Sequence, residues 1–449
     1  MLTRKDIFII RTFFILFWVL GCFGFIYQEL IPPFESLFTP LNLLGDALVM
    51  MLGIATLQKK TDAFHIAFLF AFSFVSSCLI NGLGFVQWAN GTRSFFGMLF
   101  LVPLFRYIWS DETRHRYFIT TLDKHLFIWL IVQAFCVVVQ FIKYGAGDAV
   151  GGSFGDGGSS IVSFGIYFFS FYLLNKKIDR DNVFKSIREN IWLVVLLFPT
   201  FLNETKVSFI LLLMYFFLLF PINRDYIKRV LIISPVVFIL LGGALWVYIE
   251  TVERSDDMLN PKFLMEEYLY GDYTVEELAD AVDWLTDNES SIPDMPRFAK
   301  IGFIPYIIEQ NGNHWMEGIG LQGYNGSVNM EKSKIVNEYN WFFLGTNPYV
   351  CHIMIQLGIV GLMWAIVFYW LLYSVCPPGF RRNKNISIYS ILCFIIIIAY
   401  GDLMKTLFFS VIFFLFAFLQ WTPKNGEDDE DVDEGDGETA DFSEAPLQQ

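Results

Sequence analysis

The chain has 449 residues, of which 55% are apolar, 18% are aromatic and only 17% are charged. Soluble domains carry about a quarter of charged residues, so this composition excludes an ordinary soluble protein. The net charge of −14 says nothing about a ligand, because eleven of the 45 acidic residues follow Gly426 in a polar segment that we expect to be disordered.

Long apolar runs predict an all-α polytopic membrane protein, since about 20 apolar residues cross a hydrocarbon core as a helix. The twelve predicted transmembrane helices are 7–27, 40–57, 64–83, 94–110, 126–143, 159–175, 190–203, 206–222, 229–250, 348–374, 387–401 and 404–421. The first run lacks a small-residue cleavage site, so we expect no cleavable signal peptide. This pattern divides the chain into helices 1–9 (1–250), a large extracytoplasmic loop (251–347), helices 10–12 (348–421) and an acidic tail (422–449).

The distribution of Lys and Arg predicts which side of the membrane each connection faces. Basic residues gather at the N-terminus and in alternate connections, namely Lys59, Lys60, Arg114, Arg116, Lys124, Lys176, Lys177, Arg180, Lys185, Arg188, Arg224, Lys228, Arg229, Arg381, Arg382 and Lys384. The intervening short connections hold only Arg93, Lys206 and Lys405. Because cytoplasmic loops are enriched in Lys and Arg, we predict both termini in the cytoplasm and residues 251–346 outside.

Two features at the predicted outer ends of the early helices are suited to binding an anion. Arg93 and Lys206 are cations close to helix ends, and residues 145–160, GAGDAVGGSFGDGGSS, form a glycine-rich loop whose N–H groups can cradle phosphate. A loop of this composition can equally be flexible without binding anything. Asp46 and Asp402 also lie near outer ends, where both can be structural residues.

The large outer loop is predicted to contain an amphipathic helix over residues 297–312, RFAKIGFIPYIIEQNG, bent at Pro305. Arg297 and Lys300 share a face of this helix because they are three residues apart. Together with the two outer cations above, they would suit a pyrophosphate, to which Arg offers bidentate contacts. The alternative is that these cations form ion pairs with acids of the loop.

The stretch GTNPYVCHIMIQLGIVGL, residues 345–362, places polar side chains at the start of an apolar helix. Asn347 is predicted to cap the helix and Pro348 to be its first residue. His352 and Gln356 then share a face little more than one turn below the outer end. Polar groups at that depth face protein or a water-filled cavity, so we expect this helix to line an outward-opening cavity. The alternative is that His352 only hydrogen-bonds a neighbouring helix.

Four stretches, in this order along the chain, resemble motifs of the O-antigen ligase and polymerase superfamily. They are VGGSFGDGGSSIVSFGIYFFSFYLL, LNETKVSFILLLMYFFLLF, RFAKIGFIPYIIEQNGNHWMEGIGLQGY and TNPYVCHIMIQLGIVGLMW, and they cover about a third of the chain. The set is most similar to the Wzy-type polymerases of O-antigen or exopolysaccharide. The resemblance implies a metal-independent, cofactor-free membrane glycosyltransferase of GT-C-like architecture, acting at the outer face of the bacterial cytoplasmic membrane.

The resemblance also implies a substrate, partners and two residue roles. The substrate is an oligosaccharide on a polyprenyl pyrophosphate within the membrane lipid, and the expected partners are a chain-length regulator and a flippase. By similarity, Arg297 and Lys206 contact the pyrophosphate, and positive charge there would help it to leave.

One departure from the family concerns the catalytic base, which would take a proton from the acceptor hydroxyl. The ligases carry His directly before the Asn of the last motif, where this chain has Thr346. The base therefore stays open among His352, His314 and Glu317. The departure favours a polymerase over a ligase that moves finished glycan onto a lipid or protein.

A transporter with an outer regulatory loop is the alternative from a different functional class. Transporters often show inverted repeats and broken helices in matched positions, and the sequence shows no such symmetry. It also lacks a nucleotide-binding loop, zinc-ligand spacing and a catalytic-serine motif, and we expect neither a metal nor a nucleic-acid partner.

Overall fold

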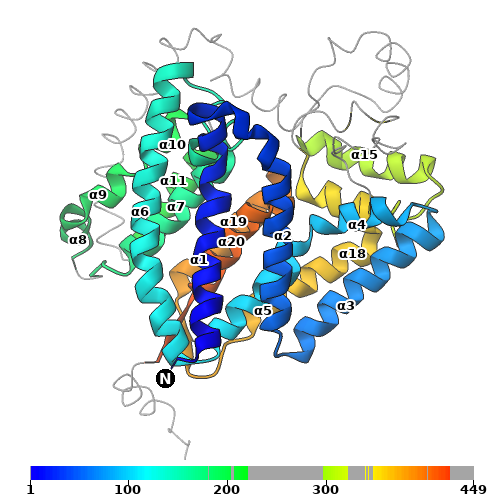
Figure 1. Cartoon of the computed structure of the whole chain (residues 1–449), viewed down its shortest axis with the longest axis horizontal. Coiled ribbons are helices and arrows are strands. Elements are labelled where there is room, and N and C mark those ends of the chain that lie inside the picture. The colour runs from blue at the N-terminus through cyan, green and yellow to red at the C-terminus, as the bar shows by residue number, and fades with distance from the viewer. Residues whose placement is uncertain are drawn as a thin grey trace, which may run out of the picture.

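The computed structural model describes residues 2–179, 182–203, 207–220, 297–321, 339, 342, 347–401 and 403–424. Helices make up most of the described chain (Figure 1). The α-helices are α1 (Arg4–Phe25), α2 (Phe38–Ala55), α3 (Lys60–Phe74), α4 (Phe85–Arg93), α5 (Phe96–Trp109), α6 (Glu112–Tyr144), α7 (Ser159–Asn175), α8 (Val183–Glu189), α9 (Ile191–Val195), α10 (Pro199–Leu202), α11 (Val207–Leu219), α15 (Arg297–Gln310), α18 (Tyr349–Ser374), α19 (Lys384–Tyr400) and α20 (Leu407–Phe418). Short 3-10 or π segments are η1 (Ile26–Leu30), η2 (Pro32–Leu37), η3 (Val75–Ile80), η4 (Gly152–Phe154) and η7 (Leu403–Lys405), and the strands are β1 (Phe380–Arg382) and β2 (Trp421–Pro423).

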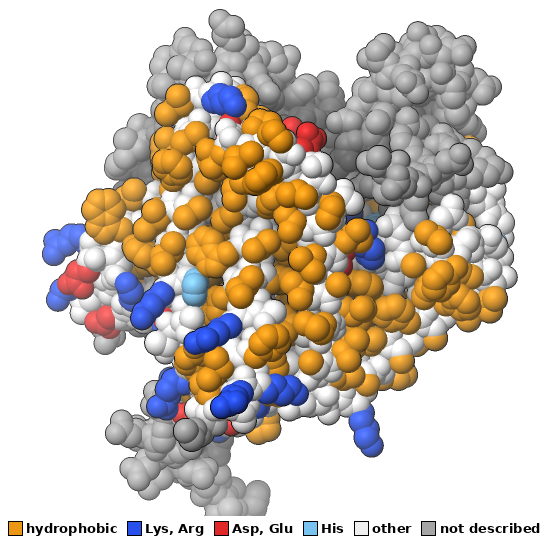
Figure 2. Space-filling model, viewed as in Figure 1, with side chains coloured by type: hydrophobic (Ala, Val, Ile, Leu, Met, Phe, Trp, Pro, Cys, Tyr) orange, Lys and Arg blue, Asp and Glu red, His pale blue; other side chains and the backbone are white. Residues whose placement is uncertain are grey.

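Several of these helices can cross a membrane by length and composition. The five that are long enough are Arg4–Leu30, Pro32–Ala55, Lys60–Ile80, Glu112–Tyr144 and Tyr349–Ser374. Hydrophobic side chains cover the surface formed by α1, α2 and α6 (Figure 2), and Ile142, for example, is 78% exposed. So large an apolar surface is typical of contact with lipid. The structure confirms an all-α chain suited to a membrane, whereas twelve spans and a GT-C-like architecture stay predictions.

The predicted span 190–203 is wrong as a continuous helix. The structure divides this stretch into α9 and α10, with a turn over residues 196–198. Pro199 has no N–H group to donate to the carbonyl four residues earlier, so it begins a new helical turn instead of continuing the old one. Helix α11, within the predicted span 206–222, has 13 residues. The predicted span 229–250 lies outside the described residues.

Helix α6 begins earlier than predicted. The expected span was 126–143, with a basic loop before it, but the helix runs over 33 residues from Glu112. The Asp111 carboxylate accepts a hydrogen bond from the Arg114 backbone N–H at 2.8 Å and so caps the helix. At 1.5 Å per residue the helix is about 50 Å long, well beyond a hydrocarbon core of about 30 Å. The cations at 114, 116 and 124 therefore extend from a helix, not from a loop.

The centre of the bundle consists of α5, α7 and α20, which are buried on nearly all sides. A helix that is hydrophobic all round belongs inside a protein or a bilayer, and here neighbouring helices cover all three. Phenylalanine packs much of this core, as in the parallel stacking of Phe168 of α7 on Phe416 of α20, with ring centroids 4.4 Å apart. Part of the high phenylalanine content thus has a structural use at the centre of the fold.

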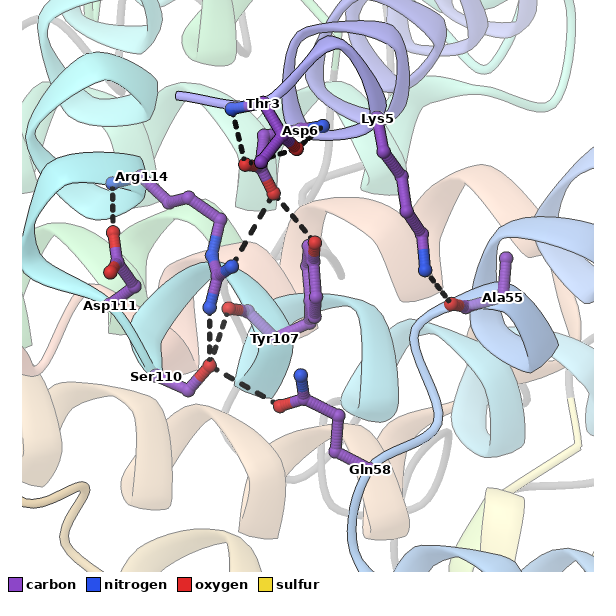
Figure 3. Close-up of polar contacts among 9 residues, drawn as sticks. All are labelled: Thr3, Lys5, Asp6, Ala55, Gln58, Tyr107, Ser110, Asp111 and Arg114. Atoms are coloured by element: carbon purple, nitrogen blue, oxygen red, sulfur yellow. Dashed lines mark hydrogen bonds and ion pairs between the residues drawn. The ribbon is translucent and has the colours of Figure 1, made fainter. Parts of the chain in front are cut away.

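One end of the bundle is closed by a polar network (Figure 3). The carboxylate of Asp6, near the start of α1, accepts hydrogen bonds from the Tyr107 hydroxyl at 2.6 Å and from the Thr3 N–H at 2.8 Å. The Arg114 guanidinium of α6 lies 3.4 Å from the same carboxylate and 4.1 Å from the centroid of the Tyr107 ring. The network joins α1, α5 and α6, and we call it the Asp6 network.

The last described residues lie at this same end. Trp109 donates its indole N–H to the Trp421 carbonyl at 3.0 Å, and β2 pairs with β1 in an antiparallel ladder. Thr422 and Pro423 belong to β2, so the predicted tail boundary at 422 falls inside an ordered strand. The acidic segment from 425 onward lies outside the described residues.

Candidate functional site

A cavity of about 640 Å³ lies at the opposite end of the bundle from the Asp6 network. Its wall comes from the C-terminal part of α1, the N-terminal part of α2, the end of α4, the loop before α7 and the beginnings of α18 and α20. Pockets for small ligands have volumes of about 300–1,000 Å³. The helix ends that were predicted to face outward therefore meet around one cavity, although the side of the membrane stays a prediction.

Arg93, a predicted substrate-binding residue, lines this cavity at the end of α4. Its Nε and Nη2 atoms lie 2.7 Å and 2.5 Å from Oδ2 of Asp46 on α2, and its Nη1 lies 3.3 Å from Asn90 Oδ1. The Asp46 side chain is mostly buried, while a third of the Arg93 side chain is exposed. Asp46, interpreted as structural from the sequence, also lines the cavity and fixes the direction of the guanidinium.

Lys405 and Thr406 line the cavity from the turn that precedes α20. The sequence indicated Lys405 only as an outer cation that supported the topology. Nothing in its local sequence marks a site, because it reaches the cavity through the packing of α20 in the bundle centre. The cavity thus receives a second positive charge from a part of the chain more than 300 residues after Arg93.

His352 lines the cavity from the first turns of α18, as predicted. Its ring lies between those of Phe95 and Tyr349, each with a centroid distance of 5.8 Å. The Gln356 amide nitrogen is 2.8 Å from its Nδ1 atom, so the polar pair predicted from the i, i+4 spacing is formed. Gln356 itself is fully buried and lies behind the histidine, not among the cavity-lining residues.

The start of α18 differs from the prediction by one residue. Asn347 was expected to cap the helix, but the cap position is Pro348 and the helix begins at Tyr349. No side chain caps it, and Oδ1 of Asn347 is buried without a hydrogen-bond partner among the described residues. Proline in the extended conformation at this position moves the boundary, and Asn347 does not line the cavity.

The glycine-rich loop contributes backbone and one carboxylate to the cavity wall. Asp156, Gly157 and Gly158 line the cavity, and Gly155 and Gly157 adopt positive φ angles of 79° and 74°. These angles favour glycine, which explains part of the loop's composition. The loop is therefore a folded turn. The N–H groups of Asp156, Gly157 and Gly158 already donate to Gln28 Oε1, the Asp148 carbonyl and the Gly155 carbonyl, so these three groups do not form the predicted phosphate cradle.

Glutamine side chains anchor this loop to the helices beneath it. Gln133 of α6 accepts a hydrogen bond from the Ser153 N–H at 2.9 Å, and Gln140 donates to the Gly152 carbonyl at 3.0 Å. Gln28 of η1 accepts a hydrogen bond from the Asp156 N–H at 2.7 Å. Because these partners come from two different elements, the loop is held in one position relative to α1 and α6.

Helix α18 is interrupted at Gly358, which has non-helical angles of φ 63° and ψ −161°. The carbonyls of Ile355 and Gln356, before the break, accept hydrogen bonds from the N–H groups of Ile319 and Gly320 at 2.9 and 3.1 Å. In a continuous helix these carbonyls would accept from residues 359 and 360. Residues 315–320, which we call the outer segment after the predicted loop to which they belong, thus provide hydrogen-bond donors for the first half of the broken helix.

The second half of α18 is satisfied by the same outer segment. Ile359 and Val360 donate their N–H groups to the carbonyls of Trp315 and Met316 at 2.9 and 3.1 Å. A Cβ atom at Gly358 would lie only 2.5 Å from the Met316 oxygen, so the close approach requires glycine. The sequence analysis missed this break, since a glycine inside an apolar run is tolerated in a helix as well.

The outer segment continues to Leu321, which lies next to the wall of the cavity. A Cβ atom at Gly91, which lines the cavity, would lie 2.9 Å from the Leu321 carbonyl carbon. On its other side, α15 packs on the first half of α18 through Ile304, Ile308 and Ile355. A displacement of α15 would therefore be transmitted to the cavity wall through the broken part of α18.

The other predicted site residues that the structure describes do not line this cavity. Helix α15 begins at Arg297, and Lys300 is buried with its Nζ 6.0 Å from the centroid of the Phe342 ring. His314 and Glu317 contact each other, with 2.8 Å between Nδ1 and Oε1. Lys206 and Thr346 lie outside the described residues, so their expected roles stay predictions.

Known proteins add no family to these observations. No protein-family model matches the chain, and no curated protein is similar to it in sequence. Within the ranges that the structure describes, no three His, Cys, Asp or Glu side chains come together as a metal site. The ionisable residues that line the cavity are Arg93, Lys405, His352, Asp46 and Asp156.

Proposed function

We propose that the protein polymerises polyprenyl-pyrophosphate-linked oligosaccharide repeats into a surface polysaccharide. The reaction would occur at the outer face of a bacterial cytoplasmic membrane, and the cavity would hold the pyrophosphate and the reacting sugars. The observation that carries the proposal is the composition of the cavity wall, which combines charged and apolar parts in one place.

The charged part suits a pyrophosphate. Arg93 and Lys405 line the cavity and supply positive charge, and a third of the Arg93 side chain is exposed there. Hydrogen bonds from cations to phosphate oxygens are shorter and about twice as strong as neutral ones. Positive charge at the leaving pyrophosphate would also stabilise the transition state of glycosyl transfer.

The apolar part suits a lipid chain next to that pyrophosphate. Val19 of α1 and Phe38 of α2 line the cavity and are 42% and 43% exposed, so the same side chains face the outer surface. Leu43 and Leu44 continue the exposed apolar surface along α2. An amphiphile could therefore place its charged group in the cavity while its chain stays against the membrane-facing side of α1 and α2.

A ligase would use the same cavity chemistry, since it also breaks a bond to a lipid-linked pyrophosphate. The two differ only in the acceptor. The resemblance to the Wzy-type polymerases and the threonine at position 346 favour the polymerase.

A transporter is the second candidate, and the break in α18 favours it. Many transporters form their binding sites at discontinuous helices. Here the break is filled by backbone of residues 315–320 through four hydrogen bonds, so its polar groups are not free to bind a substrate. The broken helix by itself therefore supports a positioning role for the outer segment.

The test is the glycan profile of a strain that lacks the gene, separated by size and into lipid-linked and surface-attached pools. A polymerase predicts single lipid-linked repeats and no long ladder, and these repeats should be oxidised by periodate added from outside. Long lipid-linked chains without transfer to a final acceptor would indicate a ligase. Single repeats protected from external periodate would indicate a transporter and contradict the proposal.

A further inference from the structure

Asp156 occupies an unusual position in the cavity wall. It lies between Gly155 and Gly157, both at positive φ, and its own N–H donates to Gln28 Oε1 at 2.7 Å. The backbone conformation of residues 155–157 is therefore well defined. The residue is exposed and lines the cavity.

The two acids of the cavity wall differ in their partners. Asp46 is mostly buried, and Arg93 contacts its Oδ2 atom through two nitrogens. The Asp156 carboxylate has neither a hydrogen bond nor an ion pair with any residue that the structure describes. Of these two carboxylates, Asp156 is the one available to a substrate.

The other candidate bases are less accessible to a substrate in the cavity. His352 is 6% exposed, stacked between two aromatic rings and in contact with the Gln356 amide. His314 and Glu317 contact each other and do not line the cavity. A general base must come within hydrogen-bond distance of the proton that it removes.

We infer that Asp156 is the catalytic base that takes the proton from the acceptor hydroxyl, an inference that rests on the proposed function. The acceptor oxygen forms a bond to the anomeric carbon of the donor glycan. The bond from that carbon to the pyrophosphate oxygen breaks, and its electron pair leaves with the polyprenyl pyrophosphate. The hydroxyl proton passes to the Asp156 carboxylate and then to water.

The experiment compares Asp156→Asn and Asp156→Glu with the wild-type full-length protein in liposomes. The substrate is the pool of lipid-linked repeats that accumulates in the strain lacking the gene, and binding is measured separately with radiolabelled polyprenyl pyrophosphate. Asp148→Asn is the matched control, because Asp148 is an exposed acid of the same loop that contacts Ser159 and does not line the cavity.

We expect Asp156→Asn to slow transfer by about 10²–10⁴-fold, the usual contribution of a general base, with binding within about twofold of wild type. Asp156→Glu should recover part of the rate, and Asp148→Asn should retain all of it.

Two results would overturn the assignment. Transfer by Asp156→Asn at the wild-type rate would exclude a base role, and loss of polyprenyl pyrophosphate binding in this variant would make Asp156 a binding residue instead. If the wild-type protein itself joins no repeats, the proposed function fails, which is a different outcome from an active wild type with an active Asp156→Asn variant.

Discussion

The two ends of the helix bundle both contain charged residues, but they use them differently. At the Asp6 network, the carboxylate contacts Thr3, Tyr107 and Arg114, so its hydrogen-bonding capacity is used within the protein. At the cavity, charged groups surround about 640 Å³ of space, and Asp156 has no such partner. Buried charges that are satisfied internally are typical of structure, whereas charges arranged around a cavity indicate a ligand.

Apart from the Asp156→Asn variant, the largest expected effect on transfer is that of Arg93→Ala. It removes a cation from the cavity and leaves the buried Asp46 without its partner, so both transfer and stability should fall. We expect transfer to decrease about 100-fold or more, measured with lipid-linked repeats in liposomes. The double variant Arg93→Gln with Asp46→Asn should restore the amount of folded protein but not transfer.

Arg116→Ala is the control for this variant, because Arg116 pairs with Glu112 on the exposed surface near the Asp6 network. Its transfer rate should equal that of wild type. If the double variant Arg93→Gln with Asp46→Asn transfers at the wild-type rate, the charged pair at the cavity is not needed for transfer. The cavity and the Asp6 network would then not differ in function.

Gly358→Ala should have the next largest effect. Alanine would have to adopt a positive φ and would approach the Met316 oxygen, which costs about 1–3 kcal/mol. If the outer segment positions the cavity wall, transfer should fall about tenfold for each 1.4 kcal/mol lost. Gly302→Ala, where a Cβ atom would meet open space, is the control, and equal activity of the two variants would argue against coupling.

Asp6→Ala should lower the stability of the protein without changing transfer. Removal of one partner from a buried ion pair costs about 3–5 kcal/mol, so the melting temperature of the purified protein should fall clearly. Transfer per folded molecule should stay at the wild-type rate. A tenfold loss of transfer in correctly folded protein would mean that the Asp6 network also acts in function.

Truncation after Lys424 should have the smallest effect. It keeps β2 and the hydrogen bond from Trp109 to the Trp421 carbonyl, so we expect wild-type melting and transfer. Truncation after Gln420 removes both and should lower the melting temperature. If the shorter and longer truncations melt alike, the strand pair does not contribute to stability.

The fold and part of the site could be predicted from local sequence. Apolar runs place most helices, and the i, i+4 spacing of His352 and Gln356 predicts their contact. The division at Pro199 could also have been anticipated, because proline interrupts helical hydrogen bonding. These features depend on residues that are close together in the chain.

The features that could not be predicted depend on distant residues. Lys405 meets Arg93 and Asp46 at one cavity only because α20 packs at the bundle centre beside α5. The break at Gly358 is stable only because residues 315–320 supply the missing hydrogen bonds. Neither arrangement has a characteristic spacing, so no sequence pattern indicates it.

The most direct test of whether the cavity holds the pyrophosphate is to measure the binding of radiolabelled polyprenyl pyrophosphate to the purified full-length protein. Wild type and Asp6→Ala should bind it equally, inorganic pyrophosphate should compete weakly, and the double variant Arg93→Gln with Asp46→Asn should bind at least tenfold more weakly. Equal binding by the Arg93 double variant and wild type, both folded, would contradict the assignment of the cavity to the pyrophosphate.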